Sequence, residues 1–99
     1  MQLLNIYKSE ERQLIIEVTR DNEALDLSTS TLELNIYDGA TAIITKEDAD
    51  FDKTEASDGI VKVFLTGTDT DIDFRKYKAK LLINGFENHE LEFIIRIIT

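Results

Sequence analysis

Apolar and polar residues alternate along most of this chain, and this period of two constrains the fold more than any other feature. Successive side chains of a β-strand leave opposite faces of a sheet, so the alternation predicts strands with one buried face. Thirteen isoleucines and ten threonines favour the same structure, because β-branched side chains suit a pleated sheet. The pattern predicts about seven strands, at residues 2–8, 11–20, 31–38, 41–46, 60–66, 75–83 and 89–98, with a short edge segment at 24–27.

Turn signals separate these runs. Asp38-Gly39 and Asn84-Gly85 favour the positive φ angles of tight hairpins, and Ser57-Asp58-Gly59 precedes another strand. Short strands separated by turns every 8–12 residues or so are typical of an immunoglobulin-like antiparallel β-sandwich. The sequence therefore predicts an all-β sandwich, with a small β-barrel as the alternative. Residues 68–74 are expected to form the one helical turn, capped by Thr68 or Asp69.

Length and composition limit the functions that such a chain can have. Its 99 residues and lack of proline predict a single domain over residues 1–99. The absence of cysteine excludes disulfides, thiolate nucleophiles and cysteine-ligated metals. A net charge of −9 argues against nucleic-acid binding, and no apolar run approaches the ~20 residues of a membrane span. The first residues, Met1-Gln2-Leu3-Leu4, lack the features of a signal peptide.

One local pattern predicts a specific tertiary contact. The segment Asp73-Phe74-Arg75-Lys76-Tyr77-Lys78-Ala79 has the spacing of the immunoglobulin D-x-G-x-Y-x-C signature, with Arg75 at the glycine and Ala79 at the cysteine. It falls at the start of the penultimate strand, where a tyrosine corner belongs. We therefore expect Tyr77 to point inward and its hydroxyl to bind backbone near the preceding loop. The alternative is that Tyr77 is simply one more inward residue of an alternating strand.

Residues that could perform catalysis are few. The only histidine, His89, lies beside Glu87 and Glu90, and no serine has the context of a nucleophile elbow. The sequence contains neither G-x-x-x-x-G-K nor G-x-G-x-x-G, the glycine patterns of phosphate-binding loops. The sequence is therefore interpreted as a non-enzyme with no catalytic residues and no cofactor, and His89 as an exposed loop residue.

Two acidic segments, at residues 48–52 and 69–73, place carboxylates two residues apart, as calcium loops do. Both fail the EF-hand pattern: the first has Lys53 in place of the glycine, and the second has Phe74 there. A different calcium site at one end of the sandwich stays open as an alternative to solvated loops, and no metal ligand is assigned.

Charge is unevenly distributed along the chain. Residues 47–73 contain nine acids against two lysines, whereas residues 74–86 contain four cations and no acid. Three of these cations, Lys76, Lys78 and Lys80, share one strand face. They are expected to pair with Glu90 and Glu92 on the final strand, and contact with phosphate or an acidic partner is the alternative.

The final strand is apolar on both faces, since only Arg96 is polar between Phe93 and Ile98. Several apolar residues thus lie opposite the expected core, where they form an interface with another chain or are covered by loops. These candidate interface residues are Ile15, Phe64, Leu82, Ile94 and Ile98.

The order of these features resembles a known family. A short Asp26-Leu27-Ser28 step precedes the strand at 32–37, and a Gly-x-Val-x-Phe-x-Leu-like strand is followed by a Thr-containing linker and the tyrosine strand. This frame is similar to the immunoglobulin-like domains of tailed-phage structural proteins, especially the N-terminal domain of baseplate upper proteins. Arg75 departs from the glycine that is usual before the tyrosine. The matching positions are Gly59, Val61, Val63, Leu65, Thr70 and Tyr77.

The resemblance implies a non-enzymatic component of a phage or prophage virion that binds other tail or baseplate proteins as a homo- or hetero-oligomer. It implies no nucleic-acid or membrane partner, and a location in the virion or in the host cytoplasm before assembly. The alternative is a small β-sandwich module that binds carbohydrate or calcium. Clustering of the aromatic residues Tyr7, Tyr37 and Phe86 would favour the carbohydrate ligand.

Overall fold

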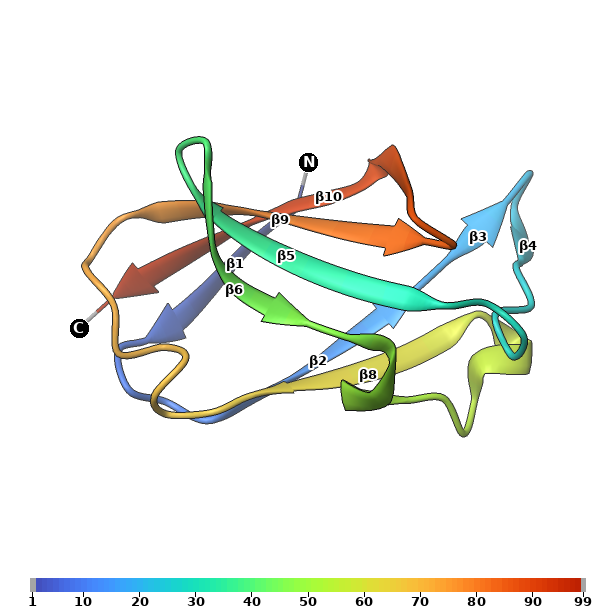
Figure 1. Cartoon of the computed structure of the whole chain (residues 1–99), viewed down its shortest axis with the longest axis horizontal. Helices are drawn as coiled ribbons and strands as arrows, with labels where there is room; N and C mark the ends of the chain where they lie inside the picture. Colours follow the sequence, from blue (N-terminus) through green and yellow to red (C-terminus); the bar gives the residue numbers. More distant parts are fainter. Residues whose placement is uncertain (1, 99) are drawn as a thin grey trace.

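The chain is a β-sandwich in a computed structural model that describes residues 2–98, except for the side chains of residues 88–90 (Figure 1). All seven predicted strands are present, most of them within one residue of the expected ends. The strands are β1 (Gln2–Tyr7), β2 (Arg12–Glu17), β3 (Thr19–Arg20), β4 (Glu23–Ala24), β5 (Leu32–Asp38), β6 (Thr41–Lys46), β7 (Phe51–Asp52), β8 (Ile60–Leu65), β9 (Lys76–Ile83) and β10 (Phe86–Ile98).

The strands form one five-stranded sheet, in the order β1-β10-β9-β5-β6, and a three-stranded sheet, in the order β2-β8-β7. The short ribbon β3–β4 extends from one end. Because the described strands form separate sheets, the alternative of a closed barrel is wrong. The expectation of purely antiparallel pairing needs one correction, since β1 runs parallel to β10 with Leu4 opposite Ile95.

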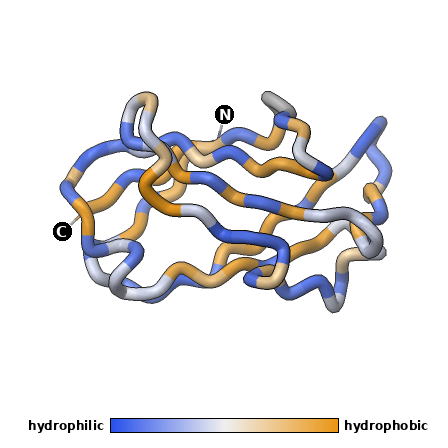
Figure 2. The backbone as a smooth tube through the Cα atoms, in the orientation of Figure 1, coloured by the Kyte–Doolittle hydropathy of each residue, from blue (hydrophilic) through white to orange (hydrophobic). Residues whose placement is uncertain are grey.

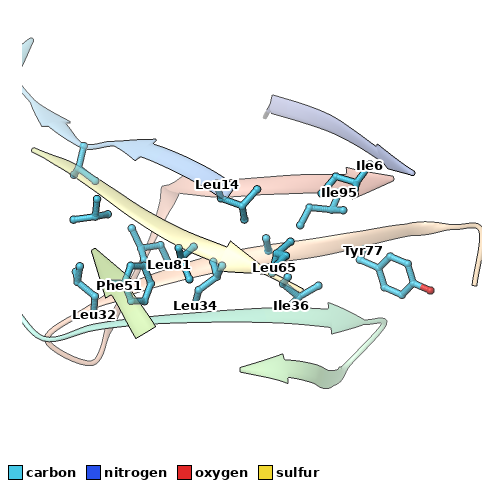
Figure 3. Close-up of a cluster of buried hydrophobic side chains, with 14 of the residues drawn as sticks. Ile6, Leu14, Leu32, Leu34, Ile36, Phe51, Leu65, Tyr77, Leu81 and Ile95 are labelled. Atoms are coloured by element: carbon cyan, nitrogen blue, oxygen red, sulfur yellow. The ribbon is translucent and has the colours of Figure 1, made fainter. Parts of the chain in front are cut away.

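The core lies between the two larger sheets, and inward side chains of both contribute to it (Figure 3). Apolar and polar residues alternate along the strands in Figure 2, as the sequence predicts. On β8, for example, Val63 is buried while its neighbour Phe64 is exposed. The buried apolar residues are Ile6, Leu14, Val18, Leu27, Leu32, Leu34, Ile36, Phe51, Ala56, Val61, Val63, Leu65, Tyr77, Ala79, Leu81, Ile95 and Ile97.

The predicted strand at 11–20 is interrupted at Val18. The Val18 amide donates to the Gly59 carbonyl at 2.8 Å, and the Val18 carbonyl accepts from the Leu25 amide at 3.0 Å. Val18 thereby ties β2 to the turn before β8 and starts the β3–β4 ribbon. Of the predicted edge segment at 24–27, only Ala24 belongs to a strand, opposite Thr19, while the Leu27 amide bonds to the Ala56 carbonyl at 2.8 Å.

The helical turn expected at 68–74 is wrong in position and in cap. The chain turns at residues 67–70, where the Thr70 amide donates to the Thr66 carbonyl at 3.2 Å and the Asp71 amide donates to the Thr68 carbonyl at 3.3 Å. Thr66 and Asp69 cap each other, because each side chain accepts a hydrogen bond from the other's amide, at 3.1 and 2.8 Å. The described residues contain no α-helix, and their only 3₁₀ turns are η1 (Asp48–Asp50) and η2 (Ala56–Asp58).

Tyr77 points into one end of the core and is only 2% exposed. Its hydroxyl donates to the backbone carbonyl of Asp73 at 2.9 Å, which is the kind of contact made by a tyrosine corner. Burial raises the pKa of this hydroxyl, so it remains a donor at neutral pH. Arg75, at the signature's glycine position, points outward and reaches Asp38 at 3.2 Å and Asp73 at 3.1 Å.

We expect Tyr77→Phe to lower the free energy of unfolding by about 1 kcal/mol, because the Asp73 carbonyl loses its donor. Urea denaturation followed by circular dichroism measures this change. Tyr7→Phe is the matched control, since the Tyr7 side chain is exposed and its hydroxyl makes no hydrogen bond within the described residues. Equal stability of the two variants would contradict the role of the Tyr77 hydroxyl.

Gly59 ends the second 3₁₀ turn at φ +75°, in the left-handed region. A Cβ at this position would lie 2.5 Å from the Val18 carbonyl oxygen and 3.1 Å from that of Leu25. Both obstacles are backbone atoms, which cannot rotate away. The glycine is therefore required by close packing as well as by its φ angle.

Gly59→Ala is expected to destabilise the fold by about 3 kcal/mol, since it adds a backbone clash to the strain of a positive φ. Gly39→Ala is the control: φ is +62° there, but no atom lies within 4 Å of the added Cβ, so its cost is about 1 kcal/mol. Thermal and urea unfolding of both variants test the difference. Similar losses of unfolding free energy in the two variants would show that close packing of Gly59 against Val18 contributes little to stability.

Candidate interaction surfaces

The five candidate interface residues do not form one patch. Leu82, Ile94 and Ile98 lie on the outer face of the five-stranded sheet. Ile15 and Phe64 lie on the outer face of the three-stranded sheet, on the other side of the core. Alternation correctly places all five away from the core, but it does not show which sheet each strand joins.

On the five-stranded sheet, β1 and β10 together make an apolar surface. Leu3 lies opposite Ile94, and Tyr7 lies opposite Ile98. Leu3 is 45% exposed and Tyr7 is 58% exposed, whereas Ile94 and Ile98 are half-buried. Leu3 is not among the interface residues predicted from the sequence. The alternation predicts that Leu3 points outward, but it does not predict that Leu3 lies beside Ile94 of β10.

Cations lie beside this apolar surface. Lys78 is directly opposite Ile94, and Lys76 is opposite Arg96. Among the described side chains, neither Lys76 nor Lys78 makes an ion pair, and Arg96 donates to the amide oxygen of Asn5 at 2.9 Å. A shallow groove of about 410 Å³ separates these lysines from the β5–β6 hairpin, where Tyr37, Gly39 and Ala40 line it. We call this apolar and cationic surface the basic face, made of Leu3, Tyr7, Lys76, Lys78, Ile94, Arg96 and Ile98.

Lys80 belongs to the same row of lysines but has partners on its own chain. Its ammonium lies 3.7 Å from carboxylate oxygens of Glu87 and Glu92 and 5.2 Å from the centre of the Tyr37 ring. The contact with Glu92 is the expected cross-strand pair. The expected pair with Glu90 falls on a side chain outside the described ones, as does the interpretation of His89. The lysine row is thus divided: Lys80 pairs within the chain, whereas Lys76 and Lys78 have no ion-pair partner among the described side chains.

Leu82 lies at the far end of the same sheet, opposite Glu33 and Glu87. Leu82 is half-buried, and the opposed residues Lys80 and Glu92 lie between it and Ile94. Of the three predicted interface residues on this sheet, only Ile94 and Ile98 therefore belong to the basic face.

The outer face of the three-stranded sheet carries two exposed apolar side chains among acids. Ile15 is 64% exposed and lies opposite Lys62, which pairs with Glu55 at 3.2 Å. Phe64 is 47% exposed, follows Lys62 by two residues on β8 and lies opposite Gln13. Acids outnumber the single lysine on this surface. We call it the acidic face, made of Ile15, Glu17, Asp52, Glu55, Lys62 and Phe64.

The carboxylates of residues 48–52 serve local turns. Asp48 accepts from the Leu32 amide at 2.9 Å and from Lys53, and these contacts lower its pKa. Asp50 accepts from the amide of Glu47, and Asp52 accepts from Thr54. The carboxylates are thus each engaged by a different donor instead of converging.

The second acidic segment is likewise divided among separate cations. Asp69 contacts Lys46 at 2.7 Å, Asp71 contacts Lys8 at 3.9 Å, and Asp73 contacts Arg75. Across the described residues, no group of three or more His, Cys, Asp or Glu side chains could hold a metal ion. The calcium alternative thus has no arrangement of ligands to support it in this part of the chain.

The three aromatic residues named for a carbohydrate site lie apart. Tyr37 is opposite Lys78 and Phe86 is opposite Ile83, a separation of five residues along β9, or roughly 16 Å. Tyr7 lies on β1, at the other edge of the sheet from β5 and β6. They therefore form no common stacking platform.

Comparison with known proteins adds no assignment: the sequence matches no family model and no curated protein. Within residues 2–98, no helix is long and apolar enough to cross a membrane.

Asp69 and Lys46 form the shortest ion pair of the described residues, and both side chains are largely buried. Burial raises the pKa of Asp69, but hydrogen bonds from Lys46 and from the Thr66 amide outweigh it, so the pKa lies below its ordinary value. A carboxyl whose pKa is lowered by folding stabilises the fold above its unfolded pKa, about 3.9 for Asp. This contribution is lost as the pH falls through the folded value.

Asp69→Asn is therefore expected to lower the free energy of unfolding by about 1–2 kcal/mol at about pH 6, as the variant leaves Lys46 partly buried without its partner. The difference from wild type should shrink as the pH falls to about 2. Urea titrations at several pH values measure it. Asp21→Asn, in an exposed turn, is the control, and a difference that stays constant with pH would contradict the assignment to Asp69.

Proposed function

We propose that this chain is a non-enzymatic assembly module that binds another protein through the basic face. The observation that carries the proposal is the exposure of Leu3 and Tyr7 beside Lys76 and Lys78, which have no ion-pair partner among the described side chains. Apolar side chains that stay in water on a rigid sheet favour contact with another chain, since each Å² buried contributes roughly 25 cal/mol. The neighbouring cations would orient that partner.

The biological setting that we propose is a tailed phage or prophage, in which the chain is a structural component of the tail or baseplate. The support is the resemblance of its sequence frame to immunoglobulin-like domains of phage structural proteins. Two positions of that frame have clear structural purposes in this sandwich: Gly59 packs against Val18, and Tyr77 binds Asp73. Its partners would then be other phage structural proteins.

Co-expression with the products of the flanking genes tests this proposal. We expect tail, neck or capsid genes as neighbours, and a complex of this chain with at least one of their products on size exclusion. Leu3→Asp should weaken that complex roughly tenfold or more, because it places a carboxylate in the apolar part of the basic face. Ile43→Asp is a matched control on β6, at the opposite edge of the same sheet, with a similar exposure of 41%.

Two results would contradict the proposal. One is a set of neighbouring genes that encode metabolic enzymes, with no complex formed by any of their products. The other is a complex that Leu3→Asp and Ile43→Asp weaken equally, since the basic face would then have no special part in binding.

A further inference from the structure

We propose that the partner at the basic face is a second copy of this chain, which presents its acidic face. This inference rests on the proposed function and names the partner of the same surface. The copies would associate head to tail, with the basic face of one sandwich on the acidic face of the next.

Charge favours this pairing of unlike faces. The protein carries a net charge of −9, yet the basic face has Lys76, Lys78 and Arg96 close together. Three described anions of that sheet face, Glu33, Glu87 and Glu92, lie opposite Leu82 or Lys80, whereas Lys78 lies opposite Ile94 and Lys76 opposite Arg96. A positive surface on an acidic protein attracts an acidic partner.

The acidic face supplies the complementary charge on the same chain. Glu17, Asp52 and Glu55 surround a single cation, Lys62, which already pairs with Glu55. Glu17 is exposed and makes no ion pair within the described side chains. Each copy thus offers both members of an electrostatically complementary pair of surfaces.

Large apolar side chains are exposed on both faces. Ile15 and Phe64 on the acidic face are as exposed as Leu3 and Tyr7 on the basic face. Because both surfaces hold large side chains in water, contact between them would remove apolar area from solvent on both sides. Charge alone would give weak and salt-sensitive binding, and burial of the apolar residues would supply the rest of the binding free energy.

The two faces lie on opposite sides of the core. A contact between unlike faces leaves one basic and one acidic face free at the ends, so the assembly grows into a ring or a filament. A symmetric contact of two basic faces would instead bring Lys76, Lys78 and Arg96 against like charges. The charge pattern therefore favours the head-to-tail arrangement.

Sedimentation velocity of the full chain tests the proposal with two variants, each of which removes one charge and one apolar side chain from a single face. The basic-face variant combines Leu3→Thr with Lys78→Gln, and the acidic-face variant combines Ile15→Thr with Glu17→Gln. Threonine suits exposed strand positions and the changes add no charge, so folding is preserved and no new complementary pair arises. Ile43→Thr, on the edge strand β6, is the control.

We expect the wild type and Ile43→Thr to form species larger than a dimer as concentration rises. Each face variant should associate at least tenfold more weakly. An equimolar mixture of the two face variants should form dimers and nothing larger, because each contributes one intact face. Raising the salt from 0.1 to 1 M should weaken wild-type association, as the Debye length falls from about 10 to about 3 Å.

Several results would overturn the inference. A wild type that stays monomeric up to the solubility limit excludes the second copy as partner. If the acidic-face variant assembles as strongly as the wild type, the acidic face takes no part in the contact. If a monomeric wild type still binds a flanking gene product in a Leu3-dependent manner, the inference fails and the proposed function stands. If that binding is also absent, both fail.

Discussion

The inward side chains of β8, β9 and β10 meet between the two sheets, and their burial commits each strand to one orientation. With Ile95 and Ile97 in the core, the pleat forces Ile94, Arg96 and Ile98 outward. A slip of one residue would bury Arg96 and expose Ile95, so the register is strongly determined. The composition of both outer faces is therefore a consequence of how the core is packed.

Two contacts lie where the chain leaves one strand and enters another. Val18 bonds to Gly59 where the chain leaves β2, and Tyr77 bonds to Asp73 where it enters β9. Both contacts involve backbone carbonyls that accept in partly or fully buried positions, where an unmade bond is costly. The pairing of β9 with β10 then places Lys78 opposite Ile94 and Lys76 opposite Arg96.

Most of the secondary structure could be predicted from the sequence, because strand alternation and Asn-Gly turns are local signals. The hairpin at Asn84-Gly85 and the inward position of Tyr77 are examples. The parallel partner of β1 could not be predicted, since alternation is the same whichever strand lies alongside. The helical turn was misplaced because Thr66 and Asp69 cap each other before the turn that the sequence indicated.

The sequence by itself determined which residues point into the core and which point to solvent, because the period of two is a property of each strand alone. It thus placed Ile15, Phe64 and Ile94 outside, and it located the excess of acids and the cluster of lysines along the chain. Only the tertiary structure decided that Ile15 and Ile94 lie on opposite surfaces and that Leu3 lies beside Ile94. Pairing between strands that are distant in the sequence decides which residues are neighbours, and the local alternation of residues does not predict that pairing.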